Sequence, residues 1–148
     1  MEIKRDSYLK QLISYRFDGL VKVITGIRRC GKSYLLKNIY RDYLIENGVK
    51  EEQIITIELD LAKDIQYRNP LILSSCVREK VEKSKEEYYL FVDEIQMSDE
   101  VANPYNTDGK KITFYDALND LRALSPIASI NLYTISQVEL ALGSEKVT

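Results

Sequence analysis

Short apolar runs alternate along this chain with segments whose apolar residues recur at helical spacing. Four runs predict β-strands: LVKVIT (20–25), QIITIEL (53–59), YYLFVDE (88–94) and ASINLYTI (128–135). The third run is apolar almost throughout, which is typical of a strand buried on both faces. Strands that alternate with helices predict an α/β fold with a three-layer αβα core and a mainly parallel sheet.

Helical spacing predicts four helices around these strands. The first covers Asp6 to about Arg16, the second begins near Lys32 and stops before Gly48, the third begins at Pro70, and Thr113 caps the fourth. Apolar stripes are formed by Leu35, Leu36, Ile39, Tyr40, Tyr43 and Leu44 in the second helix and by Phe114, Ala117, Leu118, Leu121 and Leu124 in the fourth, and the third is indicated by Leu71, Ile72, Val77 and Val81 after Pro70.

Length and composition indicate one ordinary globular domain. The chain has 148 residues, 45% of them hydrophobic, without a visible repeat, so we predict a single domain over residues 1–148. The polar segment 97–111 contains Asn-Pro and Asp-Gly and is longer than most connections, which predicts a functional or mobile loop.

Charge and residue usage exclude several classes of function. Twenty-one basic and 23 acidic residues give a net charge of -2, which provides no general attraction to nucleic acid or anionic membranes. Histidine is absent and there are two cysteines, so neither zinc sites nor histidine catalysis is expected. The N-terminus lacks a signal-peptide pattern and no apolar run is long enough to span a membrane, so we expect a cytoplasmic protein.

The segment TGIRRCGKSYLL (25–36) contains the phosphate-loop pattern G-x-x-x-x-G-K-[ST], known as Walker A. Gly26 and Gly31 allow the backbone to wrap closely around phosphate oxygens. Lys32 brings a positive charge to the β- and γ-phosphates, and the Ser33 hydroxyl is a hard ligand suited to Mg²⁺. A glycine turn with an incidental lysine would give the same letters. The position between a strand and a helix favours the phosphate loop, because the helix N-terminus attracts anions.

The loop provides the predicted nucleotide contacts. Arg28 and Arg29 are available for phosphates or an acidic partner, although exposed arginines are more often simply solvated. Cys30 lies beside a basic residue that would lower a thiol pKa, but a small residue that fits a tight loop is the simpler interpretation. Lys32 is also assigned a catalytic role. The predicted nucleotide-binding set is Gly26, Ile27, Arg28, Arg29, Cys30, Gly31, Lys32, Ser33 and Tyr34.

A second motif ends the third predicted strand. Asp93 and Glu94 follow a buried apolar run sixty residues after Ser33, which is the Walker B arrangement. We expect Asp93 to hold Mg²⁺, usually through a bound water, and Glu94 to polarise the attacking water. The carboxyl ends of central parallel strands face the ligand crevice in open α/β sheets. Two acids where a strand simply exits into solvent are the alternative interpretation.

Weaker candidates have a structural interpretation that we favour. Asp60 follows the second strand and is expected to cap a turn rather than to approach Mg²⁺. The segment Arg68-Asn69-Pro70 is expected to open a helix rather than to contact phosphate. The eleven tyrosines lie mostly on apolar stripes or strands, so we assign them to the core and its rim rather than to base stacking.

Together these motifs resemble the N-terminal ATPase domain of the uncharacterised prokaryotic AAA+-superfamily ATPases. The similarity covers roughly residues 1–125, and the segments that carry it are VKVITGIRRCGKSYLL, RNPLIL, YYLFVDEIQ and KITFYDALNDL. The resemblance implies the additional-strand, catalytic-glutamate class of P-loop NTPase. It also implies triphosphate binding by Gly26 to Ser33, Mg²⁺ binding by Asp93 and catalysis by Glu94.

The resemblance ends near residue 126. Members of the family follow the fourth strand with a Thr-Gly-Ser-Asn run that senses the γ-phosphate, for which Thr134 or Ser136 are the substitutes here. The fifth strand, arginine finger and lid would be missing, so we expect weak or absent hydrolysis. The first strand would then lie at an exposed edge of the sheet. We expect residues 137–148 to cover that edge, or the protein to self-associate through it.

Three functions therefore follow from the sequence. The first is a Mg²⁺-dependent ATP-binding ATPase domain of AAA+ type. The second is a non-catalytic nucleotide-binding or interaction module that keeps the fold. The third is a small-molecule kinase in which Asp60 positions the acceptor; the Asp-Glu pair and the absence of an arginine-rich lid after residue 125 argue against it.

Overall fold

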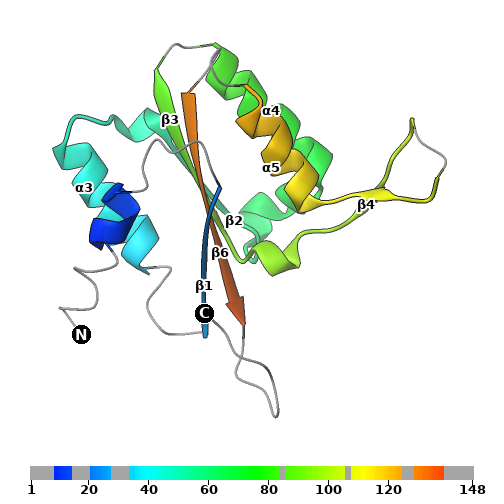
Figure 1. Cartoon of the computed structure of the whole chain (residues 1–148), viewed down its shortest axis with the longest axis horizontal. Helices are drawn as coiled ribbons and strands as arrows, with labels where there is room; N and C mark the ends of the chain where they lie inside the picture. The colour runs from blue at the N-terminus through cyan, green and yellow to red at the C-terminus, as the bar shows by residue number, and fades with distance from the viewer. Residues whose placement is uncertain are drawn as a thin grey trace.

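A computed structural model describes residues 9–14, 21–27, 34–83, 86–105, 108–124 and 129–138 (Figure 1). Residues 9–14 are helical. The remaining elements, in chain order, are β1 (Lys22–Ile27), the π-helix η1 (Leu35–Tyr40), α3 (Arg41–Glu46), η2 (Glu51–Gln53), β2 (Ile54–Glu58), η3 (Ala62–Arg68), α4 (Pro70–Glu82), β3 (Glu87–Asp93), η4 (Ile95–Met97), β4 (Val101–Ala102), β5 (Lys111–Ile112), α5 (Phe114–Arg122) and β6 (Ser129–Val138).

The main sheet has four strands in the order β1-β6-β3-β2, and all three pairings are parallel. The last strand along the chain, β6, therefore lies between the first strand and β3. Val92 of β3 aligns with Thr134 of β6, which in turn aligns with Val23 of β1. The predicted α/β fold with a mainly parallel sheet is confirmed.

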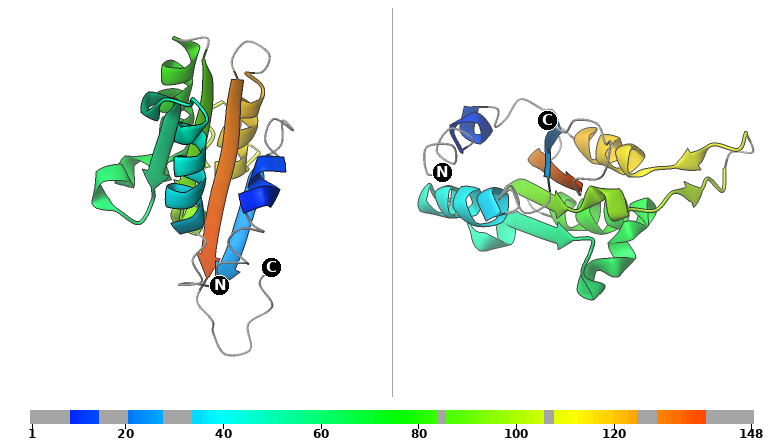
Figure 2. Two further views of the ribbon diagram at one scale, coloured as in Figure 1. Left: turned by 90° about the vertical axis from the view of Figure 1, so that its left-hand side faces the viewer. Right: turned by 90° about the horizontal axis from the view of Figure 1, so that it is seen from below.

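Helices cover both faces of the sheet, which gives three layers (Figures 1 and 2). β3 shows the alternation, since Leu90 and Val92 pack with α4 and α5 while Tyr89 and Phe91 pack with η1 and α3. The last six residues of the strand, from Tyr88 to Asp93, are buried, as its apolar run predicts. β3 therefore contributes residues to both layer boundaries.

Local signals place the helix ends close to the predicted positions. Asn69 caps α4, because its side-chain Oδ1 accepts a hydrogen bond of 2.9 Å from the backbone N–H of Leu71, and Pro70 is the first helical residue. Thr113 precedes α5, and its backbone N–H donates to the Asp116 carboxylate at 2.8 Å. Gly48, at φ +96°, follows the end of α3 in a left-handed conformation that glycine adopts without strain.

Two strands end two or three residues later than predicted. β1 covers 22–27 rather than 20–25, and β6 continues to Val138, because Gly26 and Ile27 pair with Gln137 and Val138. On α4, Leu71 and Ile72 are 44% and 43% exposed, so they lie off the buried face of the helix. The buried positions are instead Leu73, Val77 and Val81, whose four-residue spacing defines the face that packs on the sheet.

The edge position of β1 agrees with the expectation from the sequence. Within the described ranges, β1 pairs with β6 alone, and Figure 2 shows these two strands side by side at one margin of the sheet. Gln137 and Val138 lie in β6, on the paired side of β1, so they do not cover its open side. The sequence predicts that residues 137–148 cover this edge, and residues 139–148 of that segment lie outside the described residues.

The long polar segment forms an arm rather than an unstructured loop. β4 and β5 pair in an antiparallel ribbon, with Val101 opposite Ile112 and Ala102 opposite Lys111. The arm projects from the body next to α5 (Figure 1). Tyr105, near its far end, is almost fully exposed.

Candidate functional site

The phosphate-loop motif lies only partly among the described residues. Gly26 and Ile27 form the end of β1, where the backbone is still paired with β6. Tyr34 is helical and half exposed, directly before η1. The intervening positions Arg28, Arg29, Cys30, Gly31, Lys32 and Ser33 lie outside the described residues, so their predicted contacts remain predictions.

Asp93 and Glu94 lie at the carboxyl end of β3, as the sequence predicts. Asp93 is 4% exposed and Glu94 5%. Glu94 has φ 60° and ψ 50°, the left-handed conformation that costs a residue with a Cβ about 1–2 kcal/mol. Gln96 donates a hydrogen bond from Nε2 to a Glu94 carboxylate oxygen. Strained backbone at a buried acid is a pattern that concentrates at functional sites.

Lys37 joins this carboxylate to a neighbouring strand. Its Nζ atom lies 2.8 Å from Oδ2 of Asp93 and 2.8 Å from Oε2 of Glu58. Lys37 belongs to η1, the helix that follows the phosphate loop, whereas Glu58 ends β2 and pairs in register with Asp93. One lysine therefore connects the helix after the loop to the ends of two strands.

A second lysine, Lys63, contacts the other carboxylate oxygen of Glu58. Lys63 Nζ lies 3.5 Å from Glu58 Oε1 and 2.7 Å from Asp64 Oδ2. Asp64 in turn accepts a hydrogen bond of 2.9 Å from the backbone N–H of Glu58. The strand-end cluster, which we define as Lys37, Glu58, Asp93, Lys63 and Asp64, thus contains alternating charges around the end of β2.

Competing influences act on the pKa of Lys37. Partial burial lowers it, but the hydrogen bonds to Asp93 and Glu58 and the charges of these carboxylates outweigh burial, so that the pKa lies above its ordinary value of 10.5. Lys37 is therefore a cation at neutral pH.

Glu58 and Lys37 were not predicted from the sequence. Asp60, which follows the second predicted strand, is exposed in the turn after β2, in agreement with the structural role favoured for it. The signal for Glu58 was present, since it is the last residue of a strand parallel to β3. Lys37 carried no such signal, because its contact with Asp93 spans 56 positions of the chain.

The donor groups fit a magnesium site of the kind the motifs predict. A buried carboxylate supplies hard oxygen ligands, and the contact between Asp93 and Lys37 shows that a cation is accommodated against it. Within the described ranges, no group of three or more histidine, cysteine or acidic side chains is arranged to hold a metal ion alone. Mg²⁺ ordinarily combines one or two carboxylates with phosphate oxygens and water, so Ser33, a bound triphosphate and water would complete the coordination.

Other candidates from the sequence take structural roles. Thr134 is buried, and its hydroxyl donates to the Lys22 carbonyl at 3.5 Å within the sheet. The Arg68 side chain donates to the Leu59 carbonyl at 2.7 Å, beside the capped start of α4. Tyr40 and Tyr133 share a buried hydroxyl–hydroxyl hydrogen bond of 2.7 Å, which agrees with their assignment to the core. The side chain of Ser136 lies outside the described part.

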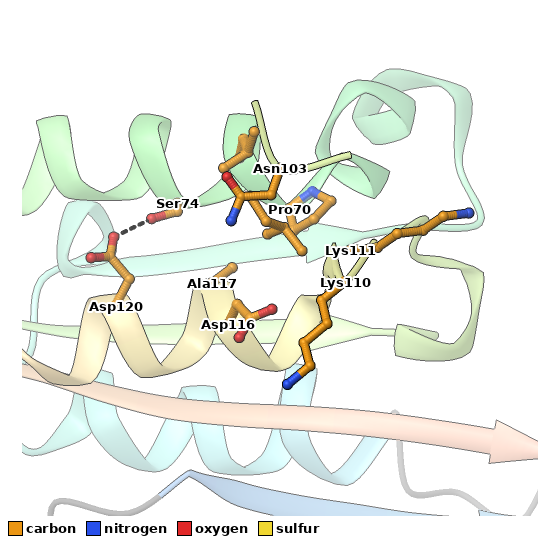
Figure 3. A pocket seen from close by; sticks show the side chains of 10 residues that line it. Pro70, Ser74, Asn103, Lys110, Lys111, Asp116, Ala117 and Asp120 are labelled. Atoms are coloured by element: carbon orange, nitrogen blue, oxygen red, sulfur yellow. Dashed lines mark hydrogen bonds between the residues drawn. The ribbon is translucent and has the colours of Figure 1, made fainter. Parts of the chain in front are cut away.

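A second polar cluster lies between α4 and α5, far from the strand ends in the sequence. Asp120 accepts a hydrogen bond from the Ser74 hydroxyl at 2.5 Å and pairs with Arg78 at 2.6 Å. The hydrogen bonds from Arg78 and Ser74 lower the pKa of Asp120. Figure 3 shows Ser74 and Asp120 at one end of an open cavity of about 430 Å³ that also reaches Lys110 and Lys111 on the arm. We call Ser74, Arg78 and Asp120 the helix-pair cluster.

No helix in the described part of the chain combines the length and apolar character required to cross a membrane.

Comparison with known proteins supports the interpretation of the fold. A protein from Haemophilus influenzae, described only as an uncharacterized protein, is 37% identical over 94 residues. That match covers 64% of this chain and 23% of the relative, so the chain spans about a quarter of the relative's length. No solved structure matches. The family described as "AAA domain" matches residues 18–107, which is more than half of the chain and includes β1, β2 and β3. The chain therefore belongs to the AAA domain family, whose members have a P-loop ATPase-like fold.

Proposed function

We propose that this chain is an ATP-binding P-loop ATPase domain of AAA+ type. In this proposal Gly26 to Ser33 hold the triphosphate, Ser33 and Asp93 bind Mg²⁺, and Glu94 is the general base. The observation that carries the proposal is the buried Asp93-Glu94 pair at the carboxyl end of a central parallel strand. Membership of the AAA domain family supports the same assignment.

The strand order supports the finer class. In the additional-strand, catalytic-glutamate class implied by the resemblance, the fourth core strand is expected to lie beside the phosphate-loop strand. Here β6 lies between β1 and β3. Glu94 directly follows Asp93 after the carboxyl end of β3, where its carboxylate accepts a hydrogen bond from Gln96. This placement suits a base that polarises a water molecule rather than a second metal ligand.

Hydrolysis is expected to be slow or absent in the chain by itself. An arginine supplied by a partner contributes a factor of about 10³–10⁵ in such reactions. Among the described arginines, Arg41, Arg68 and Arg78 contact Glu51, the Leu59 carbonyl and Asp120. None of these contacts is with Asp93 or Glu94. The kinase alternative gains no support, since Asp60 is exposed in a turn.

The experiment that tests the proposal is thermal unfolding with and without Mg-ATP, in the parent, in Lys32→Ala and in Lys50→Ala. A ligand at a hundred times its Kd stabilises the native state by about 2.7 kcal/mol. We expect this stabilisation in the parent and in Lys50→Ala, whose exposed ammonium pairs with Glu86, but not in Lys32→Ala. Absence of a shift in the folded parent would reject the proposal. Binding without turnover, even at high protein concentration, would favour the non-catalytic module.

A further inference from the structure

Lys37 places a positive charge against one carboxylate oxygen of Asp93, the residue proposed to bind Mg²⁺. Its ammonium is 2.8 Å from Oδ2 of Asp93, and the Asp93 side chain is only 6% exposed. A carboxylate oxygen in close contact with one cation attracts a second cation less strongly, because the two positive charges repel each other at short range. Lys37 and a divalent cation therefore compete for the same carboxylate.

Glu58 gives Lys37 a second acceptor at the same distance. Nζ is 2.8 Å from Oε2 of Glu58, and the two carboxylates end adjacent strands in register. The other Glu58 oxygen, Oε1, is on the side of Lys63, so Oε2 serves Lys37. An ammonium that leaves Asp93 consequently keeps one charged partner. The cost of its release is smaller than the cost of breaking an isolated pair.

We propose that Lys37 holds the Asp93 carboxylate in the metal-free protein and yields it to a divalent cation, while Glu58 retains the lysine. Lys37 and Glu58 are then positioning residues for the metal site, and neither is placed in contact with the reacting atoms. This inference rests on the proposed function, because it requires a nucleotide-bound metal at Asp93. It assigns to η1 a contribution to metal binding in addition to its place after the phosphate loop.

The test compares how strongly Mg²⁺ and nucleotide binding depend on each other. The Kd of a fluorescent ATP analogue is measured by anisotropy in excess EDTA and in saturating Mg²⁺. The coupling ratio is the Kd in EDTA divided by the Kd in Mg²⁺, so a higher ratio means that Mg²⁺ strengthens nucleotide binding more. Damage to the fold weakens both measurements and largely cancels in this ratio. The proteins are the full chain, Lys37→Gln, Glu58→Gln and the control Lys63→Gln, all at a temperature where each is folded.

The two substitutions are expected to act in opposite directions. Lys37→Gln removes the competing cation, so the coupling ratio rises by about fivefold. Glu58→Gln leaves Lys37 with Asp93 as its only carboxylate partner among the described residues and removes a negative charge near the metal, so the ratio falls by about fivefold. Lys63→Gln leaves the ratio within about twofold of the parent, because Lys63 contacts Glu58 but not Asp93.

A structural role for Lys37 would give a different result. If the cluster only stabilises the fold, both substitutions weaken binding with and without Mg²⁺ and leave the ratio unchanged. The proposal is overturned if Lys37→Gln fails to raise the ratio or Glu58→Gln fails to lower it. If the parent itself binds no nucleotide in either condition, the proposed function has failed, and this outcome is distinct from nucleotide binding with unchanged ratios.

Discussion

The two charged clusters of this protein use similar groups in different surroundings. In the strand-end cluster, Lys37 and Asp93 have side chains that are 21% and 6% exposed. In the helix-pair cluster, Arg78 and Asp120 are 34% and 47% exposed. The first gathers groups from two helices, η1 and η3, and from the ends of two strands, whereas the second connects two adjacent helices. The presence of paired charged side chains does not by itself indicate a functional site. The location of the strand-end cluster at the carboxyl ends of parallel strands is what favours a functional role.

The comparison predicts that ATP turnover depends on residues beside the strand-end cluster and not on the helix-pair cluster. Glu94→Gln is expected to keep nucleotide affinity and to reduce any ATP hydrolysis by about 10²–10⁴-fold, because the amide cannot accept the proton of the attacking water. Phosphate release measures the rate, and anisotropy measures binding. Asp120→Asn is the control and should leave both unchanged. Equal hydrolysis by Glu94→Gln and the parent would show that Glu94 is not the base.

Stability should also distinguish the clusters. Lys37→Met removes the ammonium that contacts the buried Asp93 at 2.8 Å, so we expect the free energy of unfolding to fall by about 2 kcal/mol, below the range for fully buried pairs because the Lys37 side chain retains some solvent. Arg78→Met breaks a more exposed pair and should cost about 0.5 kcal/mol. Urea unfolding of both variants measures the difference. A larger loss in Arg78→Met would contradict the assignment of the helix-pair cluster to the surface.

Acid pH should remove the contribution of the helix-pair cluster. The pKa of Asp120 is lowered in the folded state by hydrogen bonds from Arg78 and Ser74. Its stabilising effect is therefore present above the ordinary carboxyl pKa of 3.8 and is lost as pH falls through the lower folded value. We expect the difference in unfolding free energy between the parent and Asp120→Asn to be constant from pH 5 to 7 and to shrink below about pH 4. A difference that grows on acidification would reverse the sign and refute this account.

Salt should produce the smallest effect. Raising ionic strength from about 0.1 M to 1 M shortens the screening length from about 10 Å to 3 Å. The cost of Arg78→Met should then decrease by a few tenths of a kcal/mol, while the cost of Lys37→Met changes less because its partner is buried. Repeating the urea titrations in NaCl tests this. An equal response of the two variants would indicate that both pairs are similarly solvated.

Signals that act within a few residues were predictable from the sequence. Asn69 and Pro70 set the start of α4, and the apolar run before Asp93 set a fully buried strand. Contacts between elements that are distant in the sequence were not predictable from it. β6 extends past Ser136 because β1 provides backbone partners there, and Leu71 is exposed because the sheet contacts the neighbouring face of α4. Propensity does not specify which face of a helix meets the sheet.

The same limit applies to the candidate site. Asp93 and Glu94 were identified because a strand end is visible in a linear pattern. The lysine that contacts Asp93 depends on how η1 packs across β2 and β3, which only the strand order defines. Asp60 is exposed in the turn after β2, in agreement with the structural role favoured for it, whereas Glu58, which ends the strand, was not considered because the predicted strand ran one residue further.

The position of β6 in the middle of the sheet has a consequence for biosynthesis. Lys22 pairs with Tyr133, so about 110 residues must be added after β1 is made before its partner exists. At about 5–20 residues per second, β1 waits on the ribosome for roughly 5–20 s. Such distant pairing slows folding and leaves apolar strand edges open to other chains. The strand that leads into the phosphate loop is thus among the first to be synthesised and among the last to be fixed in place.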